Sequence, residues 1–427
     1  MMKIISQIKK HLARPLLALA LLLGSAKLAA WILSVVAWTV GRAEQRILCL
    51  GRTIFVDDIK AMVSYSGRLQ YYVIHRHYFE QIFSYFLGNE RKEVTEYNYH
   101  VSEIGKSGKE KYYQFLFEML PQLRRALGFS AILSGNFGYV EQQELAKVAE
   151  TQGVPVIVFH KEGMDVFKDP KLVYKDLRFI GKKMLLYNDR IKNEFLKMRV
   201  PGFTEKNSVV VGIPRLDQYF AAANPGNDRR QVVLFSFYPK SYLSFLGAAP
   251  ANYAEIEKRM NDFHIWAMQY AKANPEVKVV IKTKVPQYYV DYVVSMRDRN
   301  FPEVISNLEI TSERSSTILI PESYAVMSFN STTLIEALIA GKIILSPDLR
   351  DLVPGNNWNY FEDHPELVNY VHSREELFAI LDNPGRKNYA DEQKNDFLES
   401  LISTPDGQAG KRAESEIINT IANAKTA

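Results

Sequence analysis

The polar turn at residues 330–333 is the strongest candidate for a binding site in this chain of 427 residues. It follows an apolar run that ends near Phe329, and it opens a segment of helical composition that ends at Gly341. Hydroxyl groups and the free amides of a helix N-terminus meet at such a turn, and together they bind anions. A turn that only caps the helix, with a solvated Glu336, is the alternative. The predicted ligands of a diphosphate are Asn330, Ser331, Thr332 and Thr333.

A second candidate follows the apolar run 154–159, where His160, Lys161 and Glu162 stand next to each other before Gly163. A buried strand that ends here would deliver three ionisable groups to the carboxyl edge of a sheet, where ligands bind in open α/β folds. An imidazole or a carboxylate in this place can accept a proton from a hydroxyl group of an acceptor. We predict that His160 or Glu162 is the catalytic base. Lys161 is predicted to lie on the side where the acceptor substrate binds and to neutralise the charge of a phosphate. A solvated polar loop is the alternative.

Three basic residues near the ends of other apolar runs are predicted phosphate ligands. Arg215 follows the run VVVGIP, and its guanidinium can bind a phosphate through two hydrogen bonds. Lys282 and Lys284 alternate at the end of KVVIKTK, so a strand would direct both side chains to the same side. The alternatives are a structural pair of Arg215 with Asp217 and two solvated lysine tips.

Gly135 and Asn136 follow one more apolar run, in the segment SAILSGNFGY. This segment lacks the complete dinucleotide fingerprint and the lysine of a Walker loop, so we predict a loop on the acceptor side. The sequence contains no HExxH, DxD or GxSxG motif and no paired histidine and carboxylate spacing. A catalytic metal is therefore not expected.

The elements that must position these residues are strands joined by helical crossovers. From Arg46 onward, short runs rich in Val, Ile and aromatic residues alternate with longer amphipathic segments, including predicted helices at 140–152 and 253–274. The polar segment 220–230 contains Pro, Gly and charged residues typical of a linker. We predict two successive Rossmann-like α/β domains, 43–224 and 225–427. The expected strands are RILCLG, YYVIHR, SAILSGN, VPVIVFHKEG, KMLLYND and SVVVGIPR, then QVVLFSFYP, KVVIKTK, LEIT, YAVMSFNSTT and KIILSP.

Residues 1–42 form a separate apolar segment that is predicted to associate with a membrane. Four basic residues precede an apolar stretch at 16–40 that is long enough to span a bilayer, with Lys27 near its middle. Basic residues flank both ends, so their distribution does not set an orientation. We expect a helix or helix pair at the membrane interface, absent from both domain cores, with Trp31 and Trp38 at headgroup level. A cleaved signal peptide is the alternative.

The overall composition excludes several classes of protein. Hydrophobic residues make up 47% and charged residues 24% of the chain, which is typical of folded domains. The net charge of +5 is small for this length and does not indicate a nucleic-acid partner. The single cysteine, Cys49, excludes an internal disulfide and a cysteine-cluster zinc site, which fits a reducing compartment.

Two segments resemble a known group of enzymes. FNSTTLIEALIAGKIILSP resembles the donor-binding segment of GT-B glycosyltransferases of bacterial surface polysaccharide biosynthesis. GIPRLD is similar to the segment before the interdomain linker in that group, which includes capsule sugar transferases and CDP-glycerol glycerophosphotransferases. The resemblance covers residues 130–350 in pattern. Members of the group often carry a His-Pro pair where this chain has Lys282-Thr283-Lys284, which argues against a glycerophosphotransferase.

The resemblance implies two domains that face a cleft, with the nucleotide donor on the C-terminal domain, the acceptor on the N-terminal domain, and no metal or cofactor. It assigns Ser331, Thr332 and Glu336 to the donor, with Glu336 on a ribose hydroxyl. We therefore expect a glycosyltransferase that moves a sugar from a nucleotide-activated donor to a lipid-linked or surface-polysaccharide acceptor, at the cytoplasmic face of the bacterial inner membrane. The alternatives are a sugar-nucleotide epimerase, a glycerophosphotransferase, or a non-catalytic scaffold of polysaccharide assembly.

Overall fold

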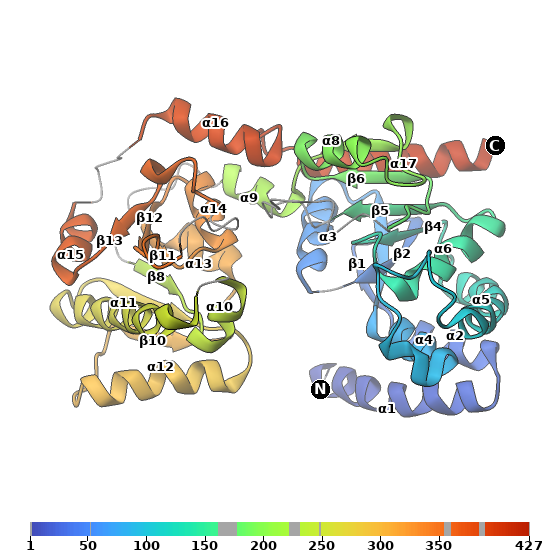
Figure 1. The fold of residues 1–427 in the computed structure, drawn as a ribbon, viewed down its shortest axis with the longest axis horizontal. Helices are drawn as coiled ribbons and strands as arrows, with labels where there is room; N and C mark the ends of the chain where they lie inside the picture. Colours follow the sequence, from blue (N-terminus) through green and yellow to red (C-terminus); the bar gives the residue numbers. More distant parts are fainter. Residues whose placement is uncertain are drawn as a thin grey trace. The chain divides into compact units, whose positions relative to one another are not determined.

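The computed structural model describes residues 2–51, 53–160, 177–221, 231–246, 249–353, 360–383 and 389–426. They form two compact units of strands and helices (Figure 1). Unit 1 contains the described residues 2–160, 177–217 and those from Glu399 onward, and unit 2 contains Gln218–Leu398. Unit 2 therefore interrupts unit 1, whereas the sequence analysis assigned the whole of 225–427 to one domain. The short helix α9 (Asp217–Ala221) and the helix α16 (Asp391–Ile402) carry the chain from one unit to the other.

Unit 1 is built on a seven-stranded sheet in the order β1-β3-β2-β4-β5-β6-β7. Only β1 is antiparallel to its neighbour; the other described pairs are parallel. The central strands are apolar and buried along most of their length because helices cover both faces of a parallel sheet. The strands are β1 Trp38–Val40, β2 Gln45–Gly51, β3 Leu69–His75, β4 Ala131–Ser134, β5 Val156–His160, β6 Lys183–Leu186 and β7 Ser208–Val210.

The helices of unit 1 include one from the far end of the chain. The last helix, α17 (Ala409–Thr426), packs against α3, and the carboxylate of Asp217 accepts hydrogen bonds from the amides of Ala409 and Gly410. Burial raises the pKa of Asp217 to about 6, although these amides oppose the shift. The other helices are α1 Met2–Leu22, α2 Ala26–Val36, α3 Thr53–Ser66, α4 His77–Leu87, α5 Lys106–Leu127, α6 Val140–Thr151 and α8 Asp189–Lys197, with 3-10 turns at Gly88–Lys92, Glu205–Asn207 and Pro214–Leu216.

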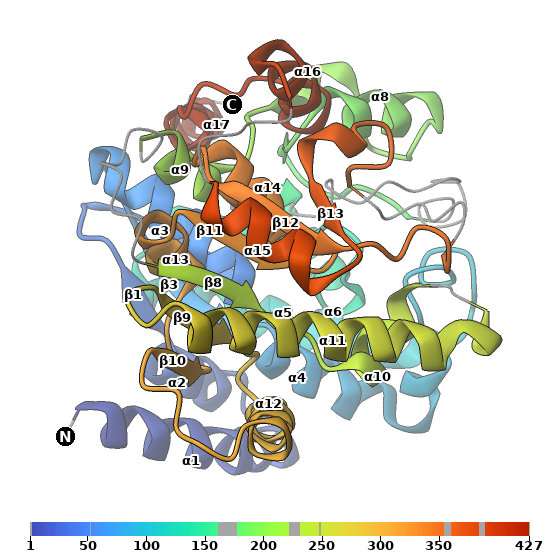
Figure 2. The same cartoon turned by 90° about the vertical axis from the view of Figure 1, so that its left-hand side faces the viewer.

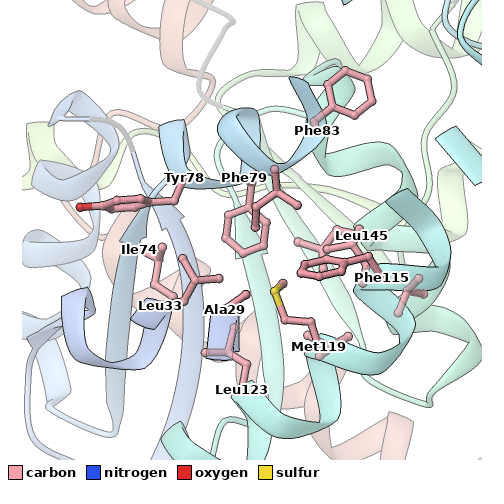
Figure 3. Close-up of a cluster of buried hydrophobic side chains, with 14 of the residues drawn as sticks. Ala29, Leu33, Ile74, Tyr78, Phe79, Phe83, Phe115, Met119, Leu123 and Leu145 are labelled. Atoms are coloured by element: carbon pink, nitrogen blue, oxygen red, sulfur yellow. The ribbon is translucent and has the colours of Figure 1, made fainter. Parts of the chain in front are cut away.

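The apolar N-terminal segment forms the predicted helix pair, α1 and α2, but the prediction that it lies outside the core is wrong. One face of each helix is buried in the same apolar cluster as α4 and α5, and α2 packs directly on α5. Figure 3 shows Ala29 and Leu33 beside Met119 and Leu123 in this cluster. Among the described residues, no helix is both long and apolar enough to cross a membrane.

Unit 2 is built on a six-stranded parallel sheet in the order β10-β9-β8-β11-β12-β13 (Figure 2). Its core is formed by residues of the inner strands and of the long helix α11. The strands are β8 Gln231–Phe235, β9 Lys278–Lys282, β10 Leu308–Thr311, β11 Ala325–Ser328, β12 Ile343–Pro347 and β13 Asn369–Val371. The helices are α10 Pro239–Leu246, α11 Tyr253–Ala273, α12 Gln287–Asn300, α13 Ser316–Glu322, α14 Thr332–Ile339 and α15 Arg374–Asp382, with 3-10 turns at Pro250–Asn252 and Pro365–Leu367.

Each sheet reverses its strand order at one place. In unit 2 the chain builds β8, β9 and β10 outward in one direction and then returns to place β11 on the other side of β8. In unit 1 the same reversal separates β2 from β4. Ligands of open α/β sheets bind outside the carboxyl ends of the strands at such a switch point. A ligand site is therefore expected at the residues that follow β8 and β11 in unit 2, and at those that follow β2 and β4 in unit 1.

Candidate functional site

The predicted diphosphate turn lies at the switch point of unit 2. It follows β11, and Ser331 is the N-cap of α14, where its Oγ accepts a hydrogen bond from the amide of Thr333 at 3.3 Å. The hydroxyl of Thr333 donates to the same Oγ at 3.0 Å. Asn330 accepts a hydrogen bond from the amide of Tyr360 and so joins the turn to a neighbouring segment. This arrangement places hydroxyls and helix amides where an anion would bind.

Glu336 lies one turn further along α14 and is buried, with 7% of its surface exposed. Its Oε2 accepts a hydrogen bond from the hydroxyl of Tyr219 at 2.9 Å. The alternative of a solvated Glu336 is therefore wrong. A buried carboxylate fixed by a tyrosine keeps one orientation, which is what a binding group for a hydroxyl ligand requires.

The two predicted lysines differ in their surroundings. Lys282 ends β9, is half-buried, and donates to the carbonyl oxygen of Thr283, and its burial lowers its pKa. Lys284 is exposed, and its ammonium nitrogen lies 4.6 Å from the ring centroid of Phe237, which follows β8. Because β9 pairs with β8, Lys284 lies near the switch point. Lys284 is thus the better placed of the two to bind a phosphate.

Ser236 and His264 form a buried pair that was not predicted from the sequence. Ser236 directly follows β8 at the switch point, and its Oγ lies 2.8 Å from Nε2 of His264 in α11. Nδ1 of His264 lies 2.7 Å from the carbonyl oxygen of Met260, to which it must donate, so Nε2 accepts the hydroxyl hydrogen of Ser236. The position of Ser236 after a strand was a detectable signal. Nothing in the sequence singled out His264, because a histidine within an amphipathic helix is a common core residue.

His264 is expected to make the stability of unit 2 depend on pH. Its burial lowers its pKa from 6.5 to about 4. Between these two pH values, His264 is protonated in the unfolded chain and neutral in the folded chain. Stability that is present above pH 6.5 is thus lost as the pH falls towards 4, by about 3 kcal/mol for this shift. Chemical denaturation between pH 7 and 4 should show a shallower loss in His264→Gln than in wild type.

In unit 1, His160 ends β5 but is fully buried, with its ring 5.3 Å from the centroid of Phe137 and 5.4 Å from that of Phe195. A base must reach its substrate, and this ring is enclosed by aromatic side chains. The other two members of the predicted cluster, Lys161 and Glu162, lie outside the described residues.

Gly135 and Asn136 follow β4 at the switch point of unit 1, as an acceptor-side loop requires. Asn136 Oδ1 accepts a hydrogen bond from the amide of Gly138 at 2.7 Å, which closes a tight turn. A side chain on Gly135 would meet the ring of Phe55 at 3.1 Å, so this position favours glycine. The loop therefore approaches α3 closely.

The sequence analysis also missed the polar start of α6, which follows this loop. Four successive polar residues, Glu141 to Glu144, are buried. Glu141 pairs with Arg76 at 2.7 Å, and Tyr99 donates to Glu144 at 2.8 Å. Burial raises the pKa of Glu141 to about 7, although Arg76 opposes the shift. A buried carboxyl group with a pKa near neutrality beside a switch point is a feature of functional sites.

Arg215 belongs to unit 1, whereas the other predicted donor residues belong to unit 2. Its Nη1 donates to the buried carboxylate of Asp58 at 3.1 Å and to the hydroxyl of Tyr187 at 2.8 Å. Tyr187 also donates to Asp58 at 2.8 Å. The alternative of a structural pair with Asp217 is wrong, because Asp217 accepts hydrogen bonds from the start of α17 instead. Arg215 is therefore part of a buried three-residue network within unit 1.

Comparison with known proteins shows the fold. No protein-family model matches the chain, and no curated protein matches it. A solved structure of a UDP-N-acetylglucosamine 2-epimerase from Listeria monocytogenes, described as putative, is 9% identical, with a TM-score of 0.51, and the match covers 87% of this chain and 95% of that one. A glycosyltransferase from Rickettsia africae (10% identity, TM-score 0.47, 88% and 98% covered) and MurG from Acinetobacter baumannii (11%, 0.40, 89% and 99%) also match. The chain has an α/β fold with two parallel-sheet units, consistent with the GT-B architecture.

Proposed function

We propose that the chain is a glycosyltransferase that binds a nucleotide-activated sugar at the switch point of unit 2 and transfers the sugar to a lipid-linked or surface-polysaccharide acceptor. The observation that supports this proposal is the position of Ser331 and Thr333 at the start of α14, directly after β11. The diphosphate would bind to the hydroxyls and the first amides of this helix, and Lys284 would add positive charge. With this charge supplied by the chain, the proposed reaction needs no metal and no cofactor.

The acceptor would bind on unit 1, at the loop that contains Gly135 and Asn136, and Lys161 keeps its predicted role of neutralising a phosphate on the acceptor side. Glu162, the other predicted base, would take the proton from the acceptor hydroxyl as its oxygen forms a bond to the sugar carbon, and the nucleotide diphosphate would leave, because the ring of His160 is enclosed by aromatic side chains. We place the reaction at the cytoplasmic face of the bacterial inner membrane, where activated sugars are made. No nucleic acid takes part.

A sugar-nucleotide epimerase is the second candidate, because a protein described as one shares the fold of this chain. The diphosphate site would serve both reactions equally well. Incubation with a panel of nucleotide sugars, without acceptor, separates the two. An epimerase converts the sugar nucleotide alone, whereas a transferase releases the nucleotide in quantity only when a lipid-linked acceptor is added. CDP-glycerol in the same panel tests for a glycerophosphotransferase, and a scaffold would be stabilised against heating by none of these compounds.

Glu336→Gln is expected to weaken donor binding with little change in stability. Glutamine keeps the shape and can still accept the Tyr219 hydroxyl, but it accepts more weakly from a ribose hydroxyl. Loss of a charged hydrogen bond typically costs about 1.5–3 kcal/mol, so the Kd should rise roughly ten- to a hundredfold. Calorimetric titration with the donor identified by the panel measures this change. The control is Glu322→Gln, which alters an exposed carboxylate of the same unit. Unchanged affinity in Glu336→Gln would contradict the donor-site assignment.

A further inference from the structure

The outer face of α1 carries an apolar stripe that the protein leaves exposed. Leu12, Leu16 and Leu19 recur at helical spacing and are exposed, and Leu22, the last residue of α1, is 73% exposed. The adjoining stripe of the same helix, which includes Leu17, is buried in the core of unit 1. Because the inner stripe is fixed by packing, α1 cannot rotate to hide its outer leucines.

The helix α2 has an exposed face of its own. Lys27, Trp31 and Val35 lie four residues apart and therefore on one face, and Trp31 is 57% exposed. The opposite face of α2, which includes Ala29 and Leu33, is buried against α5. The two helices thus present leucines, a tryptophan and a lysine outside the core. Exposed large apolar side chains gathered in this way indicate a binding surface.

The charges of this segment are all positive. The first 43 residues contain six of the 53 lysines and arginines of the chain and none of its 48 acidic residues. The remaining residues therefore carry a formal net charge of −1, and the entire positive excess of the protein lies in the segment that forms α1 and α2. Arg14 and Lys27 are exposed next to the outer stripe.

We infer that the outer face of α1 and α2 docks on an anionic lipid bilayer, with both helices lying in the plane of the surface. Leucines enter the boundary between headgroups and acyl chains, Trp31 lies at the headgroups, and basic residues bind lipid phosphates. A second copy of the chain fits this face poorly, since a symmetric contact would bring two identical positive surfaces together. The inference is independent of the reaction, because it concerns a surface apart from the strand ends.

The test is flotation of the full-length protein with vesicles. Wild type should bind vesicles that contain phosphatidylglycerol, and Leu16→Gln/Leu19→Gln should bind them at least about tenfold more weakly. Val304→Gln/Ile318→Gln removes two exposed apolar side chains of unit 2 and should bind as wild type does. Arg14→Gln and Lys27→Gln should each weaken binding about fivefold, and added salt should weaken it further. Melting temperatures verify that every variant is folded.

Three results would overturn the inference. The first is equal binding of wild type and Leu16→Gln/Leu19→Gln to anionic vesicles. The second is equal binding of wild type to anionic and to phosphatidylcholine vesicles, which would remove the role of charge. The third is absence of vesicle binding together with a dimer in light scattering that the leucine variant abolishes, which would make a second copy the occupant. A failure of the proposed transferase activity leaves all of these measurements unaffected.

Discussion

Removal of residues 1–42 is expected to leave a chain whose first unit no longer folds. The deletion takes away the buried faces of α1 and α2 and the whole of β1, which pairs with β3, and it exposes the apolar surface of α5 that α2 covers. Single Leu→Ala changes in cores typically cost about 2–5 kcal/mol, and whole domains are stable by only about 5–15 kcal/mol. Loss of several buried leucines and alanines together exceeds that margin. The truncated protein should aggregate or show no cooperative unfolding transition for unit 1.

Two substitutions in one helix provide the matched comparison. Leu17 has no exposed surface and Leu19 is 47% exposed, although both lie in α1. Leu17→Ala should lower the free energy of unfolding by about 2–5 kcal/mol, and Leu19→Ala should change it by less than about 0.5 kcal/mol. Urea denaturation followed by circular dichroism measures both. The predicted role in the core is wrong if Leu17→Ala and Leu19→Ala both change the free energy of unfolding by the same small amount. It is also wrong if the truncated chain unfolds in two normal transitions, because residues 1–42 would then be separable from the folded units.

The second large effect is expected for Asp58→Asn. The carboxylate of Asp58 is fully buried and accepts hydrogen bonds from Tyr187, from the side chain of Arg215 and from the Arg215 amide. Asparagine would leave the guanidinium without its counter-charge, and breaking a buried ion pair in this way typically costs about 3–5 kcal/mol. The cost should appear as a lower midpoint of denaturation for unit 1.

The control for this network is Asp262→Asn, which removes a half-buried partner of the exposed Lys258 and should cost less than about 1 kcal/mol. Arg215→Lys keeps the positive charge but loses the planar guanidinium group and its several N–H donors. It should therefore also destabilise the protein, by less than Asp58→Asn does. If both Asp58→Asn and Arg215→Lys melt like wild type and only weaken donor binding, Arg215 is a phosphate ligand and the structural role is wrong.

Local patterns in the sequence were sufficient to predict most of the fold. Continuous apolar runs such as those of β2, β8 and β11 are typical of buried parallel strands, and the amphipathic segments between them were correctly predicted as helices α6 and α11. Among the described strands, β1 and β13 were not predicted. Both lie at the edge of a sheet and are three residues long, which is too short to show a recognisable apolar pattern in the sequence.

Features that depend on distant contacts could not be predicted. The apolar stretch at 16–40 has the same composition whether it faces lipid or protein, and only the packing of α2 on α5 shows that one side is core. The contact of Arg215 with Asp58 could not be predicted because the two residues lie 157 positions apart and nothing in the sequence joins them. The cap at Ser331 was predictable because a helix N-terminus is a local feature.

The attachment of α17 to unit 1 has a consequence for the order of folding during synthesis. The buried carboxylate of Glu414 accepts hydrogen bonds from Ser66 and Arg68, across more than 340 residues of intervening chain, and Asp217 caps the same helix. Because α17 follows unit 2 in the chain, unit 1 begins before unit 2 during synthesis and is completed only after it. Until then, the surface of α3 that α17 will cover stays open while unit 2 emerges and folds as a continuous segment. A premature stop just before α17 would therefore damage unit 1, although most of that unit precedes unit 2 in the chain.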